Sequence, residues 1–339
     1  MTIINYNQND YFDPKIVLAI APINFIKWDY SLFNYADEFY LWYVNIPKVE
    51  WNETLISNKR WYRYSNFNIS NDEHIDILKK INKYKKKLDK KISLVLNNIG
   101  LLNDLNNLKQ EIDYILSLIQ IDRFIAADFY ILKFVQENYP NIQVNLSSLA
   151  LFSNISHFNL IKDFPNIKRI ILHRDIDEDT ILSFLNYLEK NNLNIELEFF
   201  AMNEWCYNID WLCYSLHNID EHIPFVCQRN WLYKNKYITG FMQKRSNCQI
   251  CLLWTIKNID KIEQRKKIFQ KVNFFKIPWR WHNNLVLKDY AIATKQLIKE
   301  IQKKWYIWFD KKEEIFQKTQ IIWKQFNIMF CWNCYFKNI

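Results

Sequence analysis

The stretch KRIILHRDIDEDTILSFLNYLEKNNLNIELEFFA (Lys168–Ala201) decides the fold of this chain. It begins with an apolar, β-branched run, KRIILHR (Lys168–Arg174), and ends with a second one, IELEFFA (Ile195–Ala201). Between the two runs, apolar residues recur at helical spacing and share one face: Ile181, Phe184, Leu185 and Leu188. Short apolar runs indicate buried strands and spacings of three and four indicate a helix. The stretch therefore predicts a strand, a helix and a second, parallel strand.

The same alternation continues on both sides of this unit. Further strands are predicted at Ile16–Pro22, Glu38–Val44, Ile92–Asn98, Arg123–Asp128, Ile142–Ser148 and Asn273–Trp279. Helices are predicted near Asn24–Asn34 and at Asn71–Lys86, Leu101–Ile119 and Lys288–Lys304. Eight strand–helix units in roughly 290 residues predict an α/β fold, a single (β/α)8 TIM-like barrel, with a doubly wound open sheet as the competing architecture. We expect the barrel to occupy residues 1–310 and a C-terminal helical extension to occupy 311–339.

The composition bounds the class of protein. Half of the 339 residues are hydrophobic and 17% are aromatic, so a sizeable core is expected. The longest apolar run, Ile16–Ile26, covers 11 residues, which is too short for a membrane span, and no secretory signal precedes it. A cytoplasmic protein is expected. The net charge of +9 comes largely from lysine-rich segments such as Lys83–Lys91, which indicate either a solvated helix face or a phosphate-binding surface.

The cysteines are unevenly distributed. The first of the seven cysteines is at residue 206. They are Cys206, Cys213, Cys227, Cys248, Cys251, Cys331 and Cys334. The first five fall in an insertion at about 202–255, after the seventh predicted strand, with the spacing C-x6-C-x13-C-x20-C-x2-C. Thiols in a reducing compartment are more naturally metal ligands than disulfides. The spacing alone leaves an iron–sulfur cluster, a zinc site and unligated thiols open.

In a (β/α)8 barrel, functional residues gather at the carboxyl ends of the strands. Polar and charged residues at those predicted ends are Asn97, Asn98, Asp128, Ser147, Ser148, Arg174, Lys276 and Arg280. We therefore expect one carboxylate, hydroxyl groups and three cations to meet on one face of the barrel.

Six motifs in order resemble one known family. They are YADEFYLWY (Tyr35–Tyr43), SNFNIS with the following helix and ISLVLNN, NLSSLALFSN (Asn145–Asn154), IKRIILHRDIDEDTI (Ile167–Ile181), LEFFAMNEWCYNIDWLC (Leu197–Cys213) and FFKIPWR (Phe274–Arg280). Together they resemble the U32 "peptidase" family over roughly Ile16–Lys304. That family includes iron–sulfur proteins of oxygen-independent ubiquinone hydroxylation and of RNA-base hydroxylation.

The resemblance implies a [4Fe–4S] cluster on Cys206, Cys213, Cys227 and either Cys251 or Cys248. It implies a hydroxylase component acting on an RNA base (tRNA or rRNA) or on a ubiquinone precursor, with prephenate as the oxygen donor. Arg174, Lys276 and Arg280 would hold that anion, and Ser147 and Asp128 would orient the acceptor. RNA and a homologous U32 subunit are the expected partners.

The sequence departs from the family pattern in ways that keep other functions open. Pro278 replaces a family glutamate and Leu149 a glutamine, which favours a degenerate, non-catalytic partner subunit as one alternative. Family glycine positions carry Tyr35, Trp42, Asn203, Trp211 and Trp279, substitutions expected to destabilise the fold. Peptidase activity, which the family name suggests, is the other alternative. However, the chain has neither an H-E-x-x-H nor a G-x-S-x-G motif.

Overall fold

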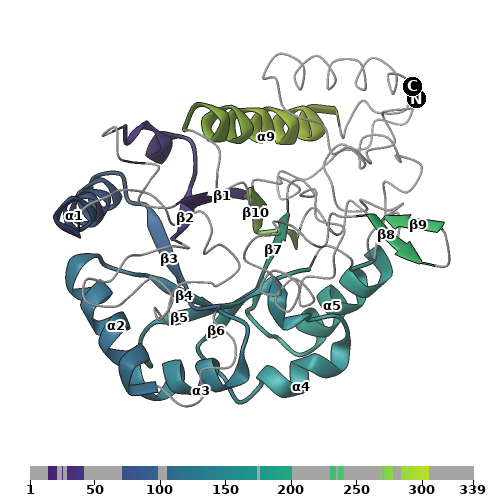
Figure 1. The fold of residues 1–339 in the computed structure, drawn as a ribbon. Helices are drawn as coiled ribbons and strands as arrows, with labels where there is room; N and C mark the ends of the chain where they lie inside the picture. The colour runs from purple at the N-terminus through teal and green to yellow at the C-terminus, as the bar shows by residue number, and fades with distance from the viewer. Residues whose placement is uncertain are drawn as a thin grey trace.

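Eight parallel strands close into a barrel at the centre of the molecule (Figure 1). The computed structural model describes residues 14–20, 25, 29–41, 71–97, 105–173, 176–200, 230–233, 236–239, 268, 271–277 and 284–304. The barrel strands are β1 (Lys15–Ile20), β2 (Glu38–Leu41), β3 (Lys91–Val95), β4 (Arg123–Ala126), β5 (Gln143–Leu146), β6 (Ile167–Ile171), β7 (Glu196–Phe200) and β10 (Phe274–Ile277). Around the barrel they follow the order β1-β10-β7-β6-β5-β4-β3-β2. The predicted single (β/α)8 barrel is confirmed, and the open sheet is excluded.

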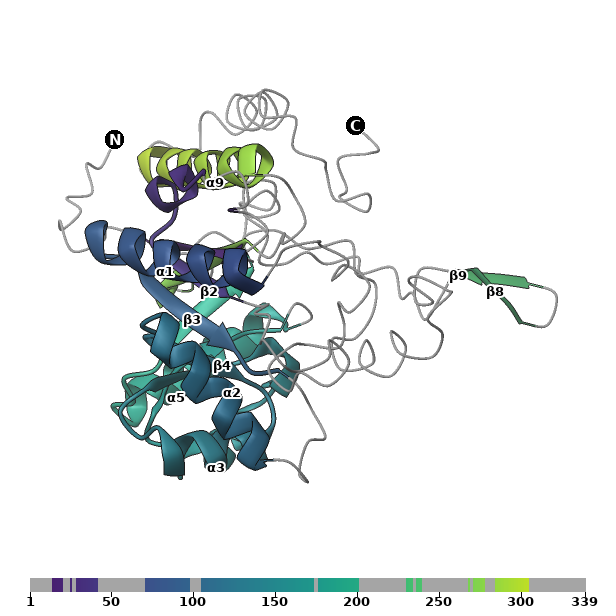
Figure 2. The same ribbon diagram turned by 60° about the vertical axis from the view of Figure 1, so that its left-hand side comes forward.

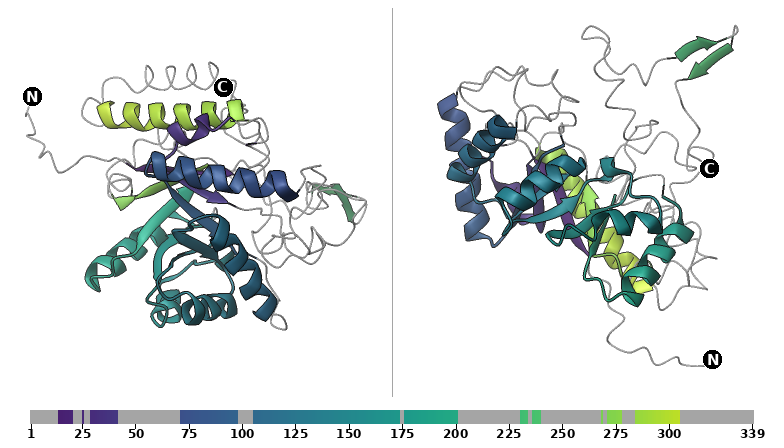
Figure 3. Two further views of the ribbon diagram at one scale, coloured as in Figure 1. Left: turned by 90° about the vertical axis from the view of Figure 1, so that its left-hand side faces the viewer. Right: turned by 90° about the horizontal axis from the view of Figure 1, so that it is seen from below.

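Helices surround the barrel on its outer side (Figure 3). They are α1 (Asn71–Lys87), α2 (Leu105–Leu118), α3 (Phe129–Asn138), α4 (Phe158–Ile161), α5 (Glu178–Lys190) and α9 (Asn284–Lys304), with the 3-10 turns η3 (Ser31–Asn34), η5 (Ser148–Ala150) and η6 (Ile155–His157). An antiparallel hairpin, β8 (Asn230–Tyr233) and β9 (Lys236–Thr239), extends away from the barrel (Figure 2). The helix predicted near 24–34 is wrong in type where it is described, because residues 31–34 form a 3-10 turn.

The main hydrophobic core lies between the strands and the helices. Alternate strand residues such as Leu94 on β3 and Ile170 on β6 pack outward against helix residues such as Ile77 and Phe184. Each fully buried aliphatic or aromatic side chain contributes about 1.5–3 kcal/mol relative to leaving it in water. His74 on α1 is also buried. Burial lowers the pKa of its imidazole to about 4, so the ring is neutral at neutral pH.

Two sets of side chains, one hydrophobic and one charged, fill the barrel interior. A second hydrophobic cluster, separate from the main core, consists of Val17, Ala19, Tyr40, Val95, Ile125, Ile171, Phe200 and Phe274. A set of buried charged residues lies at the starts and in the middles of the strands: Glu38, Arg123, Arg169 and Glu198, with the half-buried Glu196. Because strand side chains alternate between two faces, both sets occupy the inward-facing positions. The interior is therefore packed, and part of that packing is ionic.

Strand β10 closes the barrel by pairing with β1 on one side and β7 on the other. Asn273, just before β10, ties both neighbours: its backbone oxygen accepts from Lys15 N at 3.0 Å and its side-chain Oδ1 accepts from Leu197 N at 3.0 Å. Farther out, Asn284 of α9 donates its Nδ2 to the backbone oxygen of Asp29 at 3.1 Å. The first and last described parts of the chain are thus joined at several points.

The backbone at Tyr35, a position where the family pattern has glycine, does not require a glycine. Tyr35 has φ −107° and ψ −12°, which any residue can adopt, and its ring packs against the main core. The predicted destabilisation therefore does not apply at Tyr35. Left-handed backbone occurs instead at Asp89, Leu151 and Asn192. Trp42, Asn203, Trp211 and Trp279 lie outside the described residues.

Candidate functional site

Asn97 and Ser147 lie together at the carboxyl end of the barrel. Asn97 follows β3 by two residues and Ser147 directly follows β5, and both chain extensions remain paired with β4, through Leu96 N to Ile125 O and Ser147 N to Ala126 O, each at 2.8 Å. The Asn97 Nδ2 donates to the Ser147 Oγ at 3.0 Å. Both side chains are buried and continue the inward-facing alternation of Val95 and Asn145. This asparagine–serine pair is therefore a buried polar group at the end of the barrel where such folds place their sites.

The turn after β5 holds Ser147 in position. Its side chain caps the 3-10 turn η5 by accepting from Leu149 N at 3.3 Å. The turn ends at Leu151, whose φ of 50° lies in the left-handed region, a conformation that costs a non-glycine residue roughly 1–2 kcal/mol. A leucine is kept in this conformation only when the surrounding structure determines the path of the chain.

Asp128, predicted to orient the acceptor, caps a helix. It follows β4, and its Oδ1 accepts from the backbone N–H of Tyr130 in the first turn of α3 at 2.8 Å. A carboxylate at this position satisfies an otherwise unpaired N–H and interacts favourably with the helix dipole. The described contacts of Asp128 thus give it a structural role.

Lys276, predicted as a cation at the barrel mouth, lies inside the barrel. It is 5% exposed, and its Nζ is 3.5 Å from Oε1 of Glu198 and 4.0 Å from the centre of the Tyr40 ring. An ammonium group over an aromatic face and beside a carboxylate is compensated where it stands. Lys276 therefore links the ionic part of the interior to the hydrophobic part.

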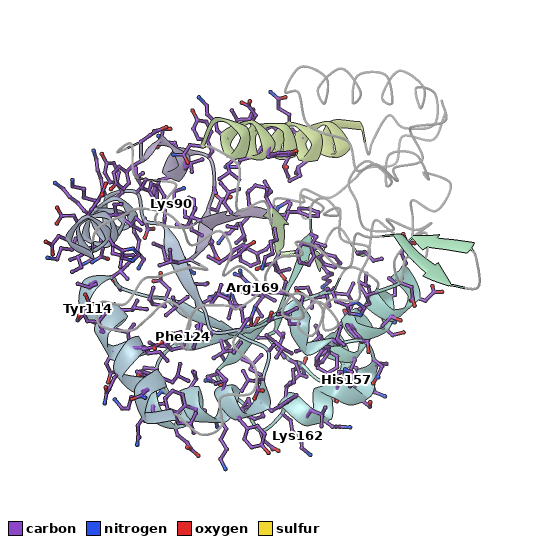
Figure 4. All side chains as sticks on the ribbon, viewed as in Figure 1. Lys90, Tyr114, Phe124, His157, Lys162 and Arg169 are labelled. Carbon is purple, nitrogen blue, oxygen red and sulfur yellow. The ribbon has the colours of Figure 1, made fainter. Side chains whose placement is uncertain are left out.

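Arg169 is the centre of that ionic part (Figure 4). Its Nη1 is 2.8 Å from Glu38 Oε2 and 2.9 Å from Glu198 Oε2, and its Nη2 is 3.0 Å from Glu196 Oε2. Its guanidinium carbon also lies 3.3 Å from the centre of the Phe274 ring. Burial alone would lower the pKa of Arg169, but the carboxylates of Glu198, Glu38 and Glu196 outweigh burial and raise it.

A second arginine extends the network. The Arg123 Nη1 donates to Glu196 Oε2 at 2.6 Å and to Asn145 Oδ1 at 3.3 Å. Burial opposes ionisation of Glu196, but the hydrogen bond from Arg123 and the charge of Arg169 prevail and lower the pKa of that carboxyl. With Lys276, three cations face three carboxylates, so we define Glu38, Arg123, Arg169, Glu196, Glu198 and Lys276 as the ionic layer.

Reasoning from the sequence missed five of these six residues. It considered the carboxyl ends of the strands, whereas most of the ionic layer lies at the starts and in the middles of the strands. A usable signal was present: E-x-E in IELEFFA and Arg169 within the apolar run of KRIILHR put charges at inward-facing positions of strands predicted to be buried. Since helices cover the outside of a parallel barrel, such charges have to face its interior.

The remaining predicted site residues, Arg174, Arg280, Cys206, Cys213, Cys227, Cys248 and Cys251, lie outside the described residues, as does Asn98. Within the described ranges, no group of three or more histidine, cysteine, aspartate or glutamate side chains is arranged to hold a metal ion. Across those same ranges, no helix is both long and apolar enough to cross a membrane.

The closed parallel barrel, with a buried polar pair at its carboxyl end, places this chain among the (β/α)8 barrel proteins. Residues 55–333 match the model of peptidase family U32, and the chain belongs to that family.

Individual similarities are more distant. The uncharacterized protease MJ0090 of Methanocaldococcus jannaschii is 24% identical over 228 residues, which are 64% of this chain and 52% of that protein. The chain thus spans about half the length of this curated relative. Among solved structures, the U32 peptidase Mk0906 aligns with a TM-score of 0.44 and 11% identity, covering 83% of this chain and 98% of that one. The Escherichia coli homocysteine methyltransferase MmuM aligns with a TM-score of 0.32 and 8% identity, over 60% and 88% of the two chains.

Proposed function

We propose that this chain is a [4Fe–4S] protein that supports oxygen-independent hydroxylation of a neutral aromatic or nucleobase substrate. The observation that carries the proposal is the position of the cysteines relative to the barrel. Strand β7 ends at Phe200, and Cys206 follows six residues later, on the segment that leaves the carboxyl end. Cys213, Cys227, Cys248 and Cys251 are on the same segment, before the chain returns to β10.

The donor set suits the cluster in chemical type. Four thiolates are what a cubane iron–sulfur cluster needs, and Cys206, Cys213 and Cys227 with Cys251 or Cys248 would hold it. When bound, the cluster would supply one-electron transfer, with a potential set by nearby hydrogen bonds and burial.

Two arginines are available for an anionic oxygen donor such as prephenate. Arg174 follows the end of β6 by three residues, and Arg280 follows the end of β10 by three residues. Guanidinium groups bind carboxylates through paired, charge-assisted hydrogen bonds, which supports this role. Lys276 is better assigned to holding Glu198 in the ionic layer, because its amine already has a carboxylate partner.

Anaerobic purification tests the cluster. We expect about four iron and four sulfide per chain, with the broad absorbance of a cubane cluster. Cys206→Ser and Cys213→Ser should each lose most of the iron, whereas Cys331→Ser, a cysteine outside the proposed set, should keep it. Stoichiometric zinc without sulfide, or unchanged iron in the Cys206 and Cys213 variants, would reject the proposal.

The substrate is tested separately. RNA from a strain that lacks the protein should lack one hydroxylated base if the substrate is RNA, whereas accumulation of an unhydroxylated quinone precursor would assign the other substrate class. Peptidase activity remains the second candidate because the family is named for it and the matched curated relative is named as a protease. Casein cleavage that survives Cys206→Ser would favour that candidate. The absence of every such activity, together with a stable complex with a second U32 protein, would favour a non-catalytic partner subunit.

A further inference from the structure

The side-chain oxygen of Asn97 is buried and has no hydrogen-bond partner among the residues that the structure describes. The residue is 7% exposed, and its amide nitrogen is already used by Ser147. A buried acceptor that has lost water and gained no partner destabilises the folded state. The carboxyl end of a (β/α)8 barrel is where ligands bind, so an unpaired acceptor at that end is a candidate ligand contact.

Ser147 complements this unpaired acceptor. Its Oγ accepts from Asn97 Nδ2 at 3.0 Å and from Leu149 N at 3.3 Å, and the described residues provide no acceptor for its own proton. The pair therefore presents a spare acceptor, the Asn97 oxygen, beside a spare donor, the Ser147 hydroxyl, and the second N–H of the Asn97 amide is a further donor. If the oxygen and nitrogen of the Asn97 amide are exchanged, Asn97 supplies the spare donors and the Ser147 Oγ supplies the spare acceptor, so the pair still presents at least one of each.

We propose that Asn97 and Ser147 form a subsite for a neutral group that carries a hydrogen-bond donor beside an acceptor, as on the amide edge of a pyrimidine base. The inference rests on the proposed function and specifies how its substrate is recognised. A carboxylate or phosphate offers only acceptors and would leave the acceptor of the pair unpaired, whereas an ammonium group offers only donors and would leave the donor unpaired.

The apolar side chains of the barrel interior favour a planar ring. Val95, two residues before Asn97 on β3, belongs to the interior hydrophobic cluster together with the aromatic rings of Tyr40 and Phe200. An apolar surface of this kind packs well against the face of a ring whose polar edge is paired elsewhere. The same donor–acceptor chemistry is offered by a pyrimidine and by the hydroxyl group of a phenol, so the test separates these two sources.

Titrations observed by ligand NMR, with uridine, 3-methyluridine and phenol as probes, test the subsite. Asn97→Leu and Ser147→Ala should each weaken uridine binding by at least about tenfold, since each leaves one polar atom of the base unpaired. Binding of 3-methyluridine, which lacks the N–H donor, should be weakened similarly for the wild type. Ser93→Ala, a buried serine lower on the same strand, is the control and should bind uridine within about twofold of the wild type.

Thermal unfolding accompanies each titration. Asn97→Leu removes the unpaired oxygen, so we expect its melting temperature to stay close to that of the wild type even though binding is lost. Phenol binding that depends on Asn97, without uridine binding, would support the subsite and assign it a hydroxyl substrate. Equal uridine binding by Asn97→Leu and the wild type, equal binding of uridine and 3-methyluridine, or no binding of either uridine or phenol would overturn it. Because the titrations need neither iron nor turnover, the subsite and the cluster can fail independently.

Discussion

Arg169 shows how much single residues inside the barrel contribute to this fold. Its side chain is fully buried and contacts three carboxylates and one aromatic ring. Buried ion pairs are weak contributors when compared with well-packed apolar side chains, because both charges lose their hydration. Removing one partner is strongly destabilising, because the remaining charges are left buried and uncompensated.

Arg169→Met is therefore expected to destabilise the protein by about 3–5 kcal/mol, because Glu38, Glu196 and Glu198 lose their shared cation. Urea unfolding followed by circular dichroism measures the change. Lys168→Met, at the exposed neighbouring position of β6, is the matched control and should change the free energy of unfolding by less than about 0.5 kcal/mol. Equal stability of the two variants would show that the ionic layer does not hold the barrel together.

The residue scale is also where the sequence was least informative. Lys276 was recognised as important but placed at the mouth, because its position near the end of a strand does not reveal that Glu198 stands beside it. Asn97 and Ser147 were both recognised at strand ends, but their hydrogen bond depends on how β3 and β5 approach each other across β4. Pairings between residues 50 positions apart follow from barrel geometry and not from local pattern.

At the scale of elements, hydrophobic periodicity was sufficient to predict the barrel strands and the longest helices. Each of the eight predicted strands overlaps an observed barrel strand, and α1 and α9 were predicted with ends within a few residues. The exception is the helix predicted near 24–34, where the structure has the short turn η3. The segment is aromatic, and the ring of Tyr30 stacks on the ring of Tyr84 of α1, with 4.4 Å between the ring centres. Tertiary packing of this kind can override a weak helical pattern.

Capping gives a prediction at the level of elements. Asp128→Ala should cost about 1 kcal/mol, because the N–H of Tyr130 in α3 loses its acceptor. Asp128→Ser keeps a capping oxygen and should recover most of that loss. Chemical denaturation of the two variants checks this expectation. If Asp128→Ala kept full stability and lost substrate binding, Asp128 would instead belong to the site, as the sequence analysis expected.

For the whole molecule, the closed barrel makes distant parts of the chain depend on one another. Strand β10 fills the position between β1 and β7, although some 70 residues separate it from β7 in sequence. The sequence predicted this closure through the number of strand–helix units. It gave no secondary structure for the cysteine-containing segment, because that segment has no regular apolar period.

Truncation tests the predicted extent of the barrel. A chain that ends at residue 271 lacks β10 and α9, leaves one edge of β1 and one edge of β7 unpaired, and should lose cooperative unfolding and aggregate. A chain that ends at residue 310 keeps every barrel strand and should melt within a few degrees of the full chain. Size-exclusion chromatography and thermal melts distinguish the two. Failure of the chain ending at 310 would show that residues 311–333, which fall within the family match, complete the folded unit.

The place of β10 also has a consequence for biosynthesis. A ribosome that has already released β1 to β7 still has to deliver more than 70 further residues before Phe274–Ile277 can dock. During that interval the nascent sheet has two open sides, which are templates for mispairing with other chains. At the usual pace of translation the interval lasts about 4–15 seconds, during which a chaperone that covers the open strand edges is expected to reduce mispairing.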